Sequence, residues 1–575
     1  MTGAEILIDA LKREGVDLLF GYPGGVVIPI FDALYRTRDI RVILTRHEQA
    51  AAHAADGYAR ATGKVGVCLV TSGPGATNTV TGIATAKLDS IPVVVISGQV
   101  RSDVIGTDAF QEADMSGLTR TICKHNYLVQ SIEELPQIVK SAFYIARSGR
   151  PGPVAIDVPV DVANAVLKKY TYPAKVNLPG YSPATRGNPK QISKLAEAIR
   201  ASKRPLVLGG GGIISSGGAE EFARFLEKTN IPATLTLMGL GALPWNHPLF
   251  LGMPGMHGRV AANRALMECD LLIGIGTRFD DRVTGRLDTF AKGAKIAHVD
   301  IDPSEIGKTL RTDIPIVGDV KSVLADLLAV VEPRNPDAWN EQIASWKEEN
   351  PLRYNQDESE EILPEYLLDR INALVDEDTI IVTDVGQHQM WTALHFHHRS
   401  PRSFLSSGGL GTMGYGLPAA MGASLGCPDK TVLLITGDGS LQMNIQELVT
   451  LALNDIPVKI AIVNNTYLGM VRQWQELFWN SNYSKTCLRE TATCPSDCRT
   501  HHADCTRPYL PDFVKLAEAN GLEGMRTAAP AEVDSVLKLG LSRKKPVLME
   551  FIVKKERNVY PMVPAGKSIS EIITG

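Results

Sequence analysis

Polar residues follow two buried strands in the last third of the chain. The apolar run Val432–Thr436 leads into Gly437-Asp438-Gly439-Ser440, and a second run, Val458–Val463, leads to Asn465. A glycine turn between a strand and a helix presents backbone N–H groups to a phosphate. Asp438 suits such a turn when a divalent cation lies between its carboxylate and the phosphate. Because adjacent parallel strands end at one sheet edge, the sequence predicts a cation and phosphate site there.

The elements that must position these residues follow an α/β pattern. Short β-branched runs such as Val65–Val70 and Val154–Val158 are typical of buried parallel strands. Amphipathic helical patterns lie between such runs, for example over 134–147 and 441–453. The sequence therefore predicts an α/β fold with three doubly wound parallel-sheet domains.

Two stretches without an apolar periodicity divide the chain. Tyr170–Pro189 is rich in proline, and Pro333–Pro364 is acidic with proline at both ends, so we interpret them as linkers, the second with a helix inside it. The predicted units are an N-terminal domain (1–170), a central domain (188–332), a C-terminal domain (364–553, with an insertion at about 485–508) and a tail (554–575).

Composition excludes several classes of function. The 575 residues hold 59 Lys and Arg against 63 Asp and Glu, so no basic excess favours nucleic acid or a membrane surface. There is no apolar run of about 18 residues that could span a bilayer, and the start lacks a basic segment followed by an apolar one. We expect a cytoplasmic protein. The 51 glycines are more than usual, which favours tight turns beside bound cofactors.

The Gly-Asp-Gly-Ser turn and the Asn-Asn pair resemble the thiamine diphosphate (ThDP) motif of the decarboxylase and carboligase superfamily. Further motifs extend this resemblance over essentially the whole chain, to the catalytic subunit of the acetohydroxyacid synthase (acetolactate synthase) family. These motifs are Gly21–Gly25, Arg46–Ala51, Thr71–Gly75, Gly106–Glu112, Arg278–Gly285, Gly386–Trp391, Gly408–Gly414 and Gly469–Gln475.

The resemblance implies a carboligase with ThDP, Mg²⁺ and a structural FAD as cofactors. Such an enzyme decarboxylates pyruvate and condenses the remaining two carbons with pyruvate or 2-ketobutyrate. The products are 2-acetolactate and 2-aceto-2-hydroxybutyrate, in the first common step of valine, leucine and isoleucine biosynthesis. The implied assembly is at least a homodimer with its sites between two chains, Glu48 of one facing Asp438 of the other, together with a small regulatory subunit.

The resemblance also assigns roles to residues at the ThDP site. Glu48 stands beside the aminopyrimidine ring, while Gly25, Phe110 and Gln111 line the reaction pocket. The Gly411 carbonyl accepts from the pyrimidine amino group. The other implied ThDP contacts are Gln387, His388, Met413 beneath the bent cofactor, Gly437, Asp438, Gly439, Ser440, Asn465, Tyr467, Gly469 and Met470, with Asp438, Asn465 and the Tyr467 carbonyl on Mg²⁺.

Two further sets of residues follow from the same resemblance. Trp474 is the residue implied to favour 2-ketobutyrate over pyruvate, two acceptors that differ by one methylene. The implied FAD contacts are Arg150, Gly210, Gly211, Gly212, Thr236, Leu237, Met238, Gly255, Met256, His257, Arg278, Arg282, Val283, Asp300 and Asp319.

The chain departs from the family in three places. Val160 stands where a Lys is expected, and Pro254 stands where a Leu is expected. Between Tyr483 and Pro511 about twenty extra residues carry four cysteines and two histidines: Cys487, Cys494, Cys498, Cys505, His501 and His502. Their spacing is not a standard zinc motif. A thiophilic metal, disulfides or redox-responsive thiols, and an inert excursion all stay open.

Two other classes of function are alternatives to the synthase. A sibling ThDP enzyme, such as a 2-keto acid decarboxylase or a pyruvate oxidase, would release acetaldehyde or acetyl phosphate from pyruvate. A non-catalytic paralogue would act as a binding subunit, but Glu48, Asp438 and Asn465 are all present and argue against it.

Overall fold

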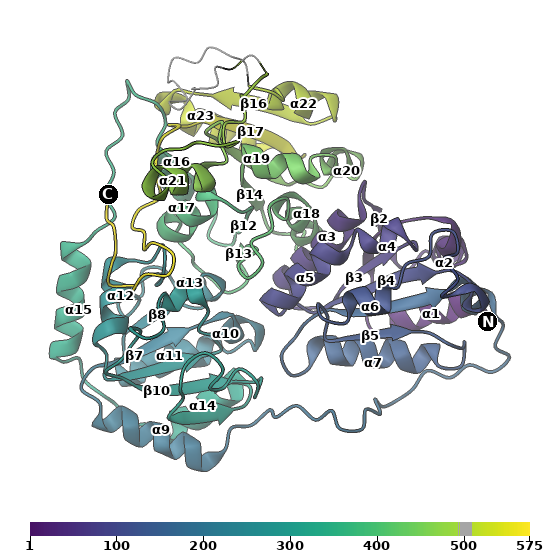
Figure 1. The fold of residues 1–575 in the computed structure, drawn as a ribbon, viewed down its shortest axis with the longest axis horizontal. Coiled ribbons are helices and arrows are strands. Elements are labelled where there is room, and N and C mark those ends of the chain that lie inside the picture. The colour runs from purple at the N-terminus through teal and green to yellow at the C-terminus, as the bar shows by residue number, and fades with distance from the viewer. Residues whose placement is uncertain (493, 495–508) are drawn as a thin grey trace.

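The computed structural model describes residues 1–492, 494 and 509–575, and in them the strands form three parallel sheets covered by helices. The N-terminal domain lies at the right of Figure 1, the central domain at the lower left and the C-terminal domain above it. The prediction of three doubly wound parallel-sheet domains is confirmed.

The N-terminal sheet has the strand order β2-β1-β3-β4-β6-β5. Alternate residues of its central strands pack into two separate apolar clusters, Cys68 and Val70 in one, Val67 and Leu69 in the other. Both faces are therefore buried, which explains the unbroken apolar runs in the sequence. The strands are β1 (Leu18–Tyr22), β2 (Arg41–Leu44), β3 (Gly66–Val70), β4 (Val93–Gln99), β5 (His125–Leu128) and β6 (Val154–Pro159); the helices are α1 (Gly3–Arg13), α2 (Ile28–Thr37), α3 (Glu48–Thr62), α4 (Pro74–Thr77), α5 (Val80–Asp89), α6 (Met115–Thr119), α7 (Leu135–Arg147) and α8 (Val160–Asn164).

The central sheet has the order β11-β10-β9-β7-β8, so the direction of strand addition reverses between β7 and β9. Its strands are β7 (Pro205–Gly209), β8 (Ala233–Leu235), β9 (Leu271–Ile275), β10 (Lys295–Asp300) and β11 (Ile314–Val317). Its helices are α9 (Pro189–Ala201), α10 (Gly211–Ser215), α11 (Ala219–Thr229), α12 (Val260–Glu268), α13 (Asp281–Thr284) and α14 (Val320–Val330).

The C-terminal sheet repeats the topology of the N-terminal one, in the order β13-β12-β14-β15-β17-β16. The strands are β12 (Ile380–Thr383), β13 (Phe404–Leu405), β14 (Val432–Gly437), β15 (Lys459–Asn464), β16 (Glu523–Thr527) and β17 (Val547–Ile552). The helices are α16 (Pro364–Leu374), α17 (Gln387–His395), α18 (Gly416–Gly426), α19 (Asp438–Leu441), α20 (Glu447–Leu453), α21 (Gly469–Phe478), α22 (Phe513–Ala519) and α23 (Val533–Ser542).

One predicted helix is interrupted. The pattern over 441–453 predicts a continuous helix, but α19 ends at Leu441, a 3₁₀ turn covers Gln442–Asn444, and α20 starts at Glu447. The buried Asn444 side chain donates to the Gly414 carbonyl at 2.7 Å, so a tertiary contact holds the turn that separates the two helices.

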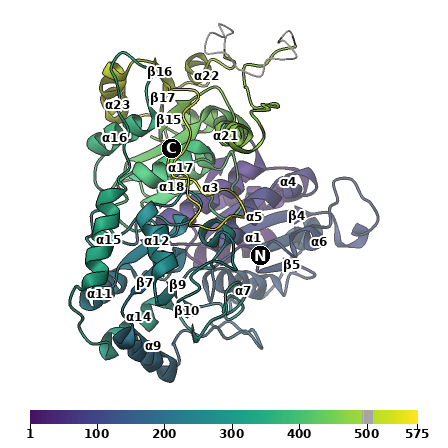
Figure 2. The ribbon, with the colours of Figure 1, turned by 60° about the vertical axis from the view of Figure 1, so that its left-hand side comes forward.

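Helices α3 and α18 join the N-terminal and C-terminal domains, and Figure 2 shows them side by side. Small residues allow their backbones to approach closely. A Cβ added to Gly57 would lie 2.1 Å from the Ala419 carbonyl oxygen, and one added to Gly422 would lie 1.9 Å from that of Ala54. The two domains therefore pack on a surface that only glycine can form at these positions.

The connecting segments run over the outside of the domains. Residues 165–188 lead from α8 to α9 without a helix or strand of the main sheets, and α15 (Ala338–Glu349) packs on the central domain through Trp339, Ile343 and Trp346. The C-terminal tail returns to the central domain, where the Val563 N–H donates to the Met256 carbonyl at 2.7 Å. No described helix is long and apolar enough to cross a membrane.

The cysteines fall into two groups. Cys68, Cys123 and Cys269 are buried as small core residues, and Cys427 is half-buried. Of the insertion, Cys487 and Cys494 are half-buried, while Cys498, Cys505, His501 and His502 lie outside the described residues. Within the described part of the chain, no group of three or more His, Cys, Asp or Glu side chains could hold a metal.

Candidate active site

Strands β12 and β14 are neighbours in the C-terminal sheet, and their connections leave in opposite directions along it. Such a switch point is where open α/β sheets bind ligands, at the carboxyl ends of the strands. Gln387 follows β12, Asp438 follows β14, and Asn465 follows β15. The fold therefore gathers the polar residues singled out in the sequence along one edge.

A cavity of about 80 Å³ opens at this edge. Most of the residues implied for ThDP and Mg²⁺ line it, all of them from the C-terminal domain. They are Gln387, His388, Met413, Gly437, Asp438, Gly439, Ser440, Asn465, Tyr467, Gly469 and Met470.

The charge of this cavity centres on Asp438. Its carboxylate is buried, Oδ2 has no hydrogen-bond partner in the described structure, and burial raises the pKa of Asp438 to about 7. A divalent cation beside the carboxylate would favour the charged form of Asp438 and give Oδ2 a partner. The site residues therefore fit a bound Mg²⁺.

His388 offers a neutral donor in the same cavity. Burial lowers the pKa of His388 to about 3, and its Nε2 has no partner among the described residues. A Cβ added to Gly437 would lie 2.9 Å from His388 Nδ1, so glycine is needed for this approach. A neutral imidazole can donate one N–H to a phosphate oxygen.

The turn after β15 orients Asn465 and Tyr467. The Asn465 Nδ2 donates to Gln387 Oε1 at 3.0 Å, and Asn465 Oδ1 accepts from the Tyr467 N–H at 3.1 Å. Between them Thr466 has a φ of 64°, in the left-handed region that a β-branched residue rarely adopts. Such backbone strain concentrates at functional sites, and here it lies between two implied Mg²⁺ ligands.

The segment that carries Gly411 and Met413 lies next to the cavity. Met413 lines it, whereas Gly411 does not; the nearest neighbour of a Cβ added to Gly411 is the cavity residue Val385, at 3.9 Å. The buried Asp384 holds the end of this segment, since its carboxylate oxygens accept the N–H groups of Gly414 at 2.8 Å and Gly416 at 3.1 Å.

The N-terminal candidates gather at the equivalent edge of their own sheet. His47 caps α3 through its Nδ1, which accepts from the Gln49 N–H at 3.1 Å, so the helix begins at Glu48. The Asn78 amide donates to Glu48 Oε2 at 2.9 Å, and a Cβ added to Gly75 would lie 3.2 Å from Glu48 Oε1. Glu48 is thus fixed beside the turn that follows β3.

The other N-terminal candidates are close to the same turn. A Cβ added to Gly73 would lie 2.8 Å from the Gln111 carbonyl oxygen, and Gln111 itself has a left-handed φ of 60°. Gly25 faces open space, and the Phe110 side chain is 88% exposed. These residues form a second half-site, and in the described residues no N-terminal side chain lines the cavity of the C-terminal domain.

Trp474 lies on α21, one turn after the cavity residues Met470 and Val471. Its indole is half-buried, does not line the cavity, and its Nε1 has no partner among the described residues.

A larger cavity of about 510 Å³ lies between the three domains. It opens at the switch point of the central sheet, between the turns after β7 and β9. A Cβ added to Gly210 would lie 2.2 Å from the Gly276 carbonyl oxygen, so these turns depend on glycine. Its walls include Arg150, Gly210, Gly211, Gly212, Thr236, Met238, Arg278, Asp300 and Asp319 from the implied FAD set.

The rest of the implied FAD set does not line this cavity. Gly255, Met256, His257, Arg282 and Val283 gather against the C-terminal tail, where the Met256 N–H donates to the Arg282 carbonyl at 2.7 Å and His257 Nδ1 lies 3.2 Å from the Pro561 carbonyl oxygen. Leu237 is half-buried and packs against the core of the central domain. The structure thus divides the implied set between a cavity wall and a neighbouring turn.

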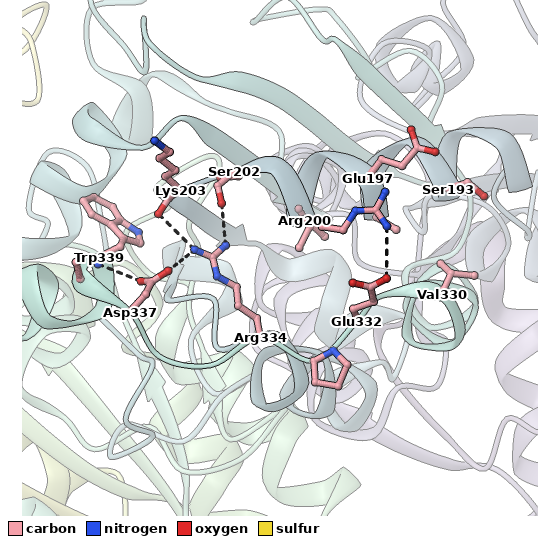
Figure 3. Close-up of a pocket in the computed structure, with 14 residues that line it drawn as sticks. Ser193, Glu197, Arg200, Ser202, Lys203, Val330, Glu332, Arg334, Asp337 and Trp339 are labelled. Atoms are coloured by element: carbon pink, nitrogen blue, oxygen red, sulfur yellow. Dashed lines mark hydrogen bonds and ion pairs between the residues drawn. The ribbon is translucent and has the colours of Figure 1, made fainter.

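Another cavity, of about 650 Å³, lies elsewhere, between α9 and the start of α15. Figure 3 shows that its charged groups face each other: Arg334 contacts Asp337, and Arg200 lies 3.4 Å from Glu332. None of the implied cofactor residues lines it, so it does not belong to the candidate site.

Residues outside the family motifs also build the site. Asp384 and Thr466 were not singled out in the sequence, although Asp384 directly follows β12 and Thr466 is the second residue after β15. Their position just after a strand is the feature of the sequence that could have revealed them, because strand ends at a switch point carry ligand contacts in open α/β sheets.

Comparison with protein families agrees with this geometry. The chain matches the models of the N-terminal TPP binding domain (residues 1–118), the central domain (192–327) and the C-terminal TPP binding domain (384–551) of thiamine pyrophosphate enzymes. Fold and site therefore define a thiamine pyrophosphate enzyme.

Relatives over the full length narrow the class. The chain is 50% identical to a probable acetolactate synthase large subunit of Methanocaldococcus jannaschii and 48% identical to the acetolactate synthase of Mycobacterium bovis. It is 45% identical to the acetolactate synthase large subunit of Haemophilus influenzae. These alignments cover 100% of this chain and 95%, 91% and 98% of the relatives, respectively. The chain belongs to the acetolactate synthase large-subunit family.

Proposed function

We propose that this protein decarboxylates pyruvate with ThDP and joins the remaining two carbons to a second pyruvate, giving 2-acetolactate. The observation that carries the proposal is the buried carboxylate of Asp438, unpartnered at Oδ2, in one cavity with His388 and Asn465. The full-length relatives named acetolactate synthase support the reaction, and a step of branched-chain amino acid biosynthesis is consistent with it.

When bound, ThDP supplies the electron sink that stabilises negative charge as a 2-keto acid loses carbon dioxide. Asp438, Asn465 and the Tyr467 carbonyl would hold Mg²⁺, and Gln387 with neutral His388 would contact the diphosphate. Met413 in the cavity wall and Gly411 beside it would contact the rings of ThDP.

Glu48 would serve the aminopyrimidine ring across a subunit boundary. Within one chain the Glu48 half-site and the Asp438 cavity are separate sets of residues. We therefore propose a homodimer in which Glu48 of each chain faces Asp438 of the other. The glutamate would exchange a proton with the pyrimidine, for which a carboxylate is suited and an amide is not.

The second substrate would meet residues from both halves. Gly25, with open space around it, and Gln111 and Phe110 would shape the pocket near Glu48. Trp474 would lie against the acceptor from the C-terminal side. On this basis we propose that 2-ketobutyrate is a second acceptor, with the indole contacting its extra methylene.

A structural FAD would occupy the cavity between the three domains. The glycine turns after β7 and β9 suit a diphosphate, and Asp319, whose side chain caps α14 by accepting from Ser322 N at 3.2 Å, lies in the same wall. No electron transfer is required for the proposed reaction. Because relatives are named as large subunits, we also propose a small regulatory subunit as partner.

The test is cofactor removal and restoration. The purified chain is dialysed against EDTA, incubated with pyruvate, and its products are identified by mass spectrometry before and after adding ThDP, Mg²⁺ and FAD. The proposal predicts 2-acetolactate that depends on both ThDP and Mg²⁺. Acetaldehyde or acetyl phosphate as the main product would assign a sibling reaction, and no product would support the non-catalytic alternative.

A further inference from the structure

The segment Gly408–Met413 lies where the three domains meet. On one side, a Cβ added to Gly409 would lie 2.8 Å from Asp89 Oδ1 of the N-terminal domain. On the other, a Cβ added to Gly408 would lie 2.6 Å from Met238 Sδ of the central domain. The segment itself belongs to the C-terminal domain and carries Gly411 and Met413.

Asp89 holds this segment by its backbone. Its Oδ2 accepts from the Gly408 N–H at 3.1 Å, and its Oδ1 accepts from the Gly409 N–H at 2.7 Å. Hydrogen bonds from backbone N–H groups to a carboxylate are stronger than those between neutral groups. The second attachment is Thr85, one turn earlier on α5, whose hydroxyl lies 2.8 Å from that of Thr412.

The position of Asp89 in its helix has no local explanation. It is the last residue of α5, where a negative charge is unfavourable because the helix dipole places partial negative charge there. Its side chain is also fully buried. Arg60, 6% exposed, compensates for the charge: its Nη2 lies 2.8 Å from Asp89 Oδ2, while its Nε donates to Asp56 at 2.6 Å. Burying a charge is costly unless it is paired in this way.

We propose that Asp89 is a positioning residue of the ThDP site, which holds Gly408–Met413 so that the Gly411 carbonyl and the Met413 side chain meet the cofactor. This inference rests on the proposed function. The N-terminal domain would then serve catalysis twice, through Glu48 for the other chain and through Asp89 for its own. Asp89 and Met238 also line the proposed flavin cavity. A flavin bound there would therefore contact the two residues that lie on either side of Gly408–Met413.

The test compares two substitutions, each of which replaces one of the two carboxylates paired with Arg60 by a neutral amide. Asp89→Asn weakens the contact with Gly408 and Gly409, whereas Asp56→Asn leaves these contacts in place; Asp56 bonds instead to Arg60 and to the Tyr415 hydroxyl. Binding of ThDP to the full-length protein is titrated by tryptophan fluorescence at saturating Mg²⁺ and FAD, and thermal unfolding is recorded for each variant.

Asp89→Asn is expected to raise the apparent Kd for ThDP about tenfold, because charge-assisted hydrogen bonds to the segment are lost. Asp56→Asn is expected to change this Kd less than twofold, although both variants unfold at a lower temperature. Equal changes in Kd for the two variants, or none for Asp89→Asn, would overturn the proposal.

A milder substitution covers the case in which Asp89→Asn does not fold. Thr85→Val keeps the shape of the side chain and removes the contact with Thr412, and it is expected to raise the Kd for ThDP a few-fold. An unchanged Kd for Thr85→Val in that case overturns the proposal. Absence of ThDP binding by the wild-type protein would instead contradict the proposed function.

Discussion

Asn78 donates a hydrogen bond from its side-chain amide to the Glu48 carboxylate over 2.9 Å. Glu48 is the first residue of α3, and Asn78 follows the short helix α4, so the contact joins the ends of two elements beside β3. It fixes one carboxylate oxygen and directs the other towards the turn at Gly75. The orientation of Glu48 is thus set by its own chain, before any second chain is present.

Glu48→Gln is expected to lower the rate of acetolactate formation by about 10²–10⁴-fold, because an amide cannot exchange the pyrimidine proton. The amide keeps the size of the side chain, so the unfolding temperature should hardly change. The same substitution at the exposed Glu341 is the control. Turnover near that of the wild type would remove Glu48 from the proposed mechanism.

Mixing variants tests the two-chain arrangement. Glu48→Gln and Asp438→Asn each damage a different half-site, so heterodimers formed by co-expression contain one intact site and one doubly altered site. Recovery of part of the wild-type activity in the mixture is expected. Activity no higher than that of the separate variants would contradict a site shared between chains.

Asp438→Asn is expected to weaken Mg²⁺-dependent ThDP binding by more than about tenfold, since the amide provides no negative charge for the cation. Burial raises the pKa of Asp438 to about 7, so without Mg²⁺ the substitution should not lower the unfolding temperature at pH 8. Titration calorimetry measures the first effect and calorimetric unfolding the second. Asp429→Asn, at an exposed turn, is the control; equal Mg²⁺ dependence in both variants would refute the ligand assignment.

Trp474→Leu is expected to lower the preference for 2-ketobutyrate over pyruvate by ~1–3 kcal/mol, about the value of one methylene in a pocket. The matched control is Trp479→Leu, because Trp479 lies at the end of the same helix and is 67% exposed. Competition between the two acceptors, with both products quantified, gives the ratio. If Trp474→Leu and Trp479→Leu leave the same ratio as the wild type, Trp474 does not set acceptor choice.

Glu447 should make stability depend on pH. Its Oε1 accepts the Arg46 N–H at 2.8 Å, its Oε2 accepts from the Thr450 hydroxyl at 2.7 Å, and burial raises the pKa of Glu447 to about 7 from an ordinary 4.5. Because the folded pKa is the higher one, the protonated form stabilises the fold below pH 4.5, and this contribution is lost as the pH rises to 7.

Glu447→Gln removes that titration: its amide oxygen can still accept the Arg46 N–H, and its amide N–H can donate to the Thr450 hydroxyl oxygen, which reverses that contact. Relative to the wild type, the variant should gain stability between pH 5 and 8, by at most about 3 kcal/mol. Urea denaturation at several pH values measures the difference, with Glu341→Gln as control. Denaturation midpoints that change with pH in parallel for wild type and Glu447→Gln would show that Glu447 does not titrate in this range.

The fold was predictable from the sequence because its strands are buried on both faces. Runs such as Val65–Val70 and Val154–Val158 predict strands within a residue of β3 and β6. The interruption after Leu441 was not predictable, because it depends on a contact between Asn444 and Gly414, thirty residues apart in the chain. Local periodicity carries no information about such contacts.

The site was predictable where its residues follow strands in sequence, as Asp438 and Asn465 do. Contacts between domains were not, because Asp89 and Gly409 are 320 residues apart and neither belongs to a local pattern that reveals the other. The only feature of the sequence that pointed to a special role for Asp89 was its unfavourable position at the C-terminal end of a helix. The separation of Gly255 and Met256 from the wall of the flavin cavity likewise depends on the packing of the C-terminal tail.

The measurement that tests the central claim most directly is the stoichiometry of the reaction with pyruvate alone. Carbon dioxide, 2-acetolactate and residual pyruvate are quantified in one incubation with ThDP and Mg²⁺. A carboligase consumes two pyruvates for each carbon dioxide and each 2-acetolactate, and that ratio is the predicted result. One carbon dioxide for each pyruvate consumed, with no 2-acetolactate, would contradict the account.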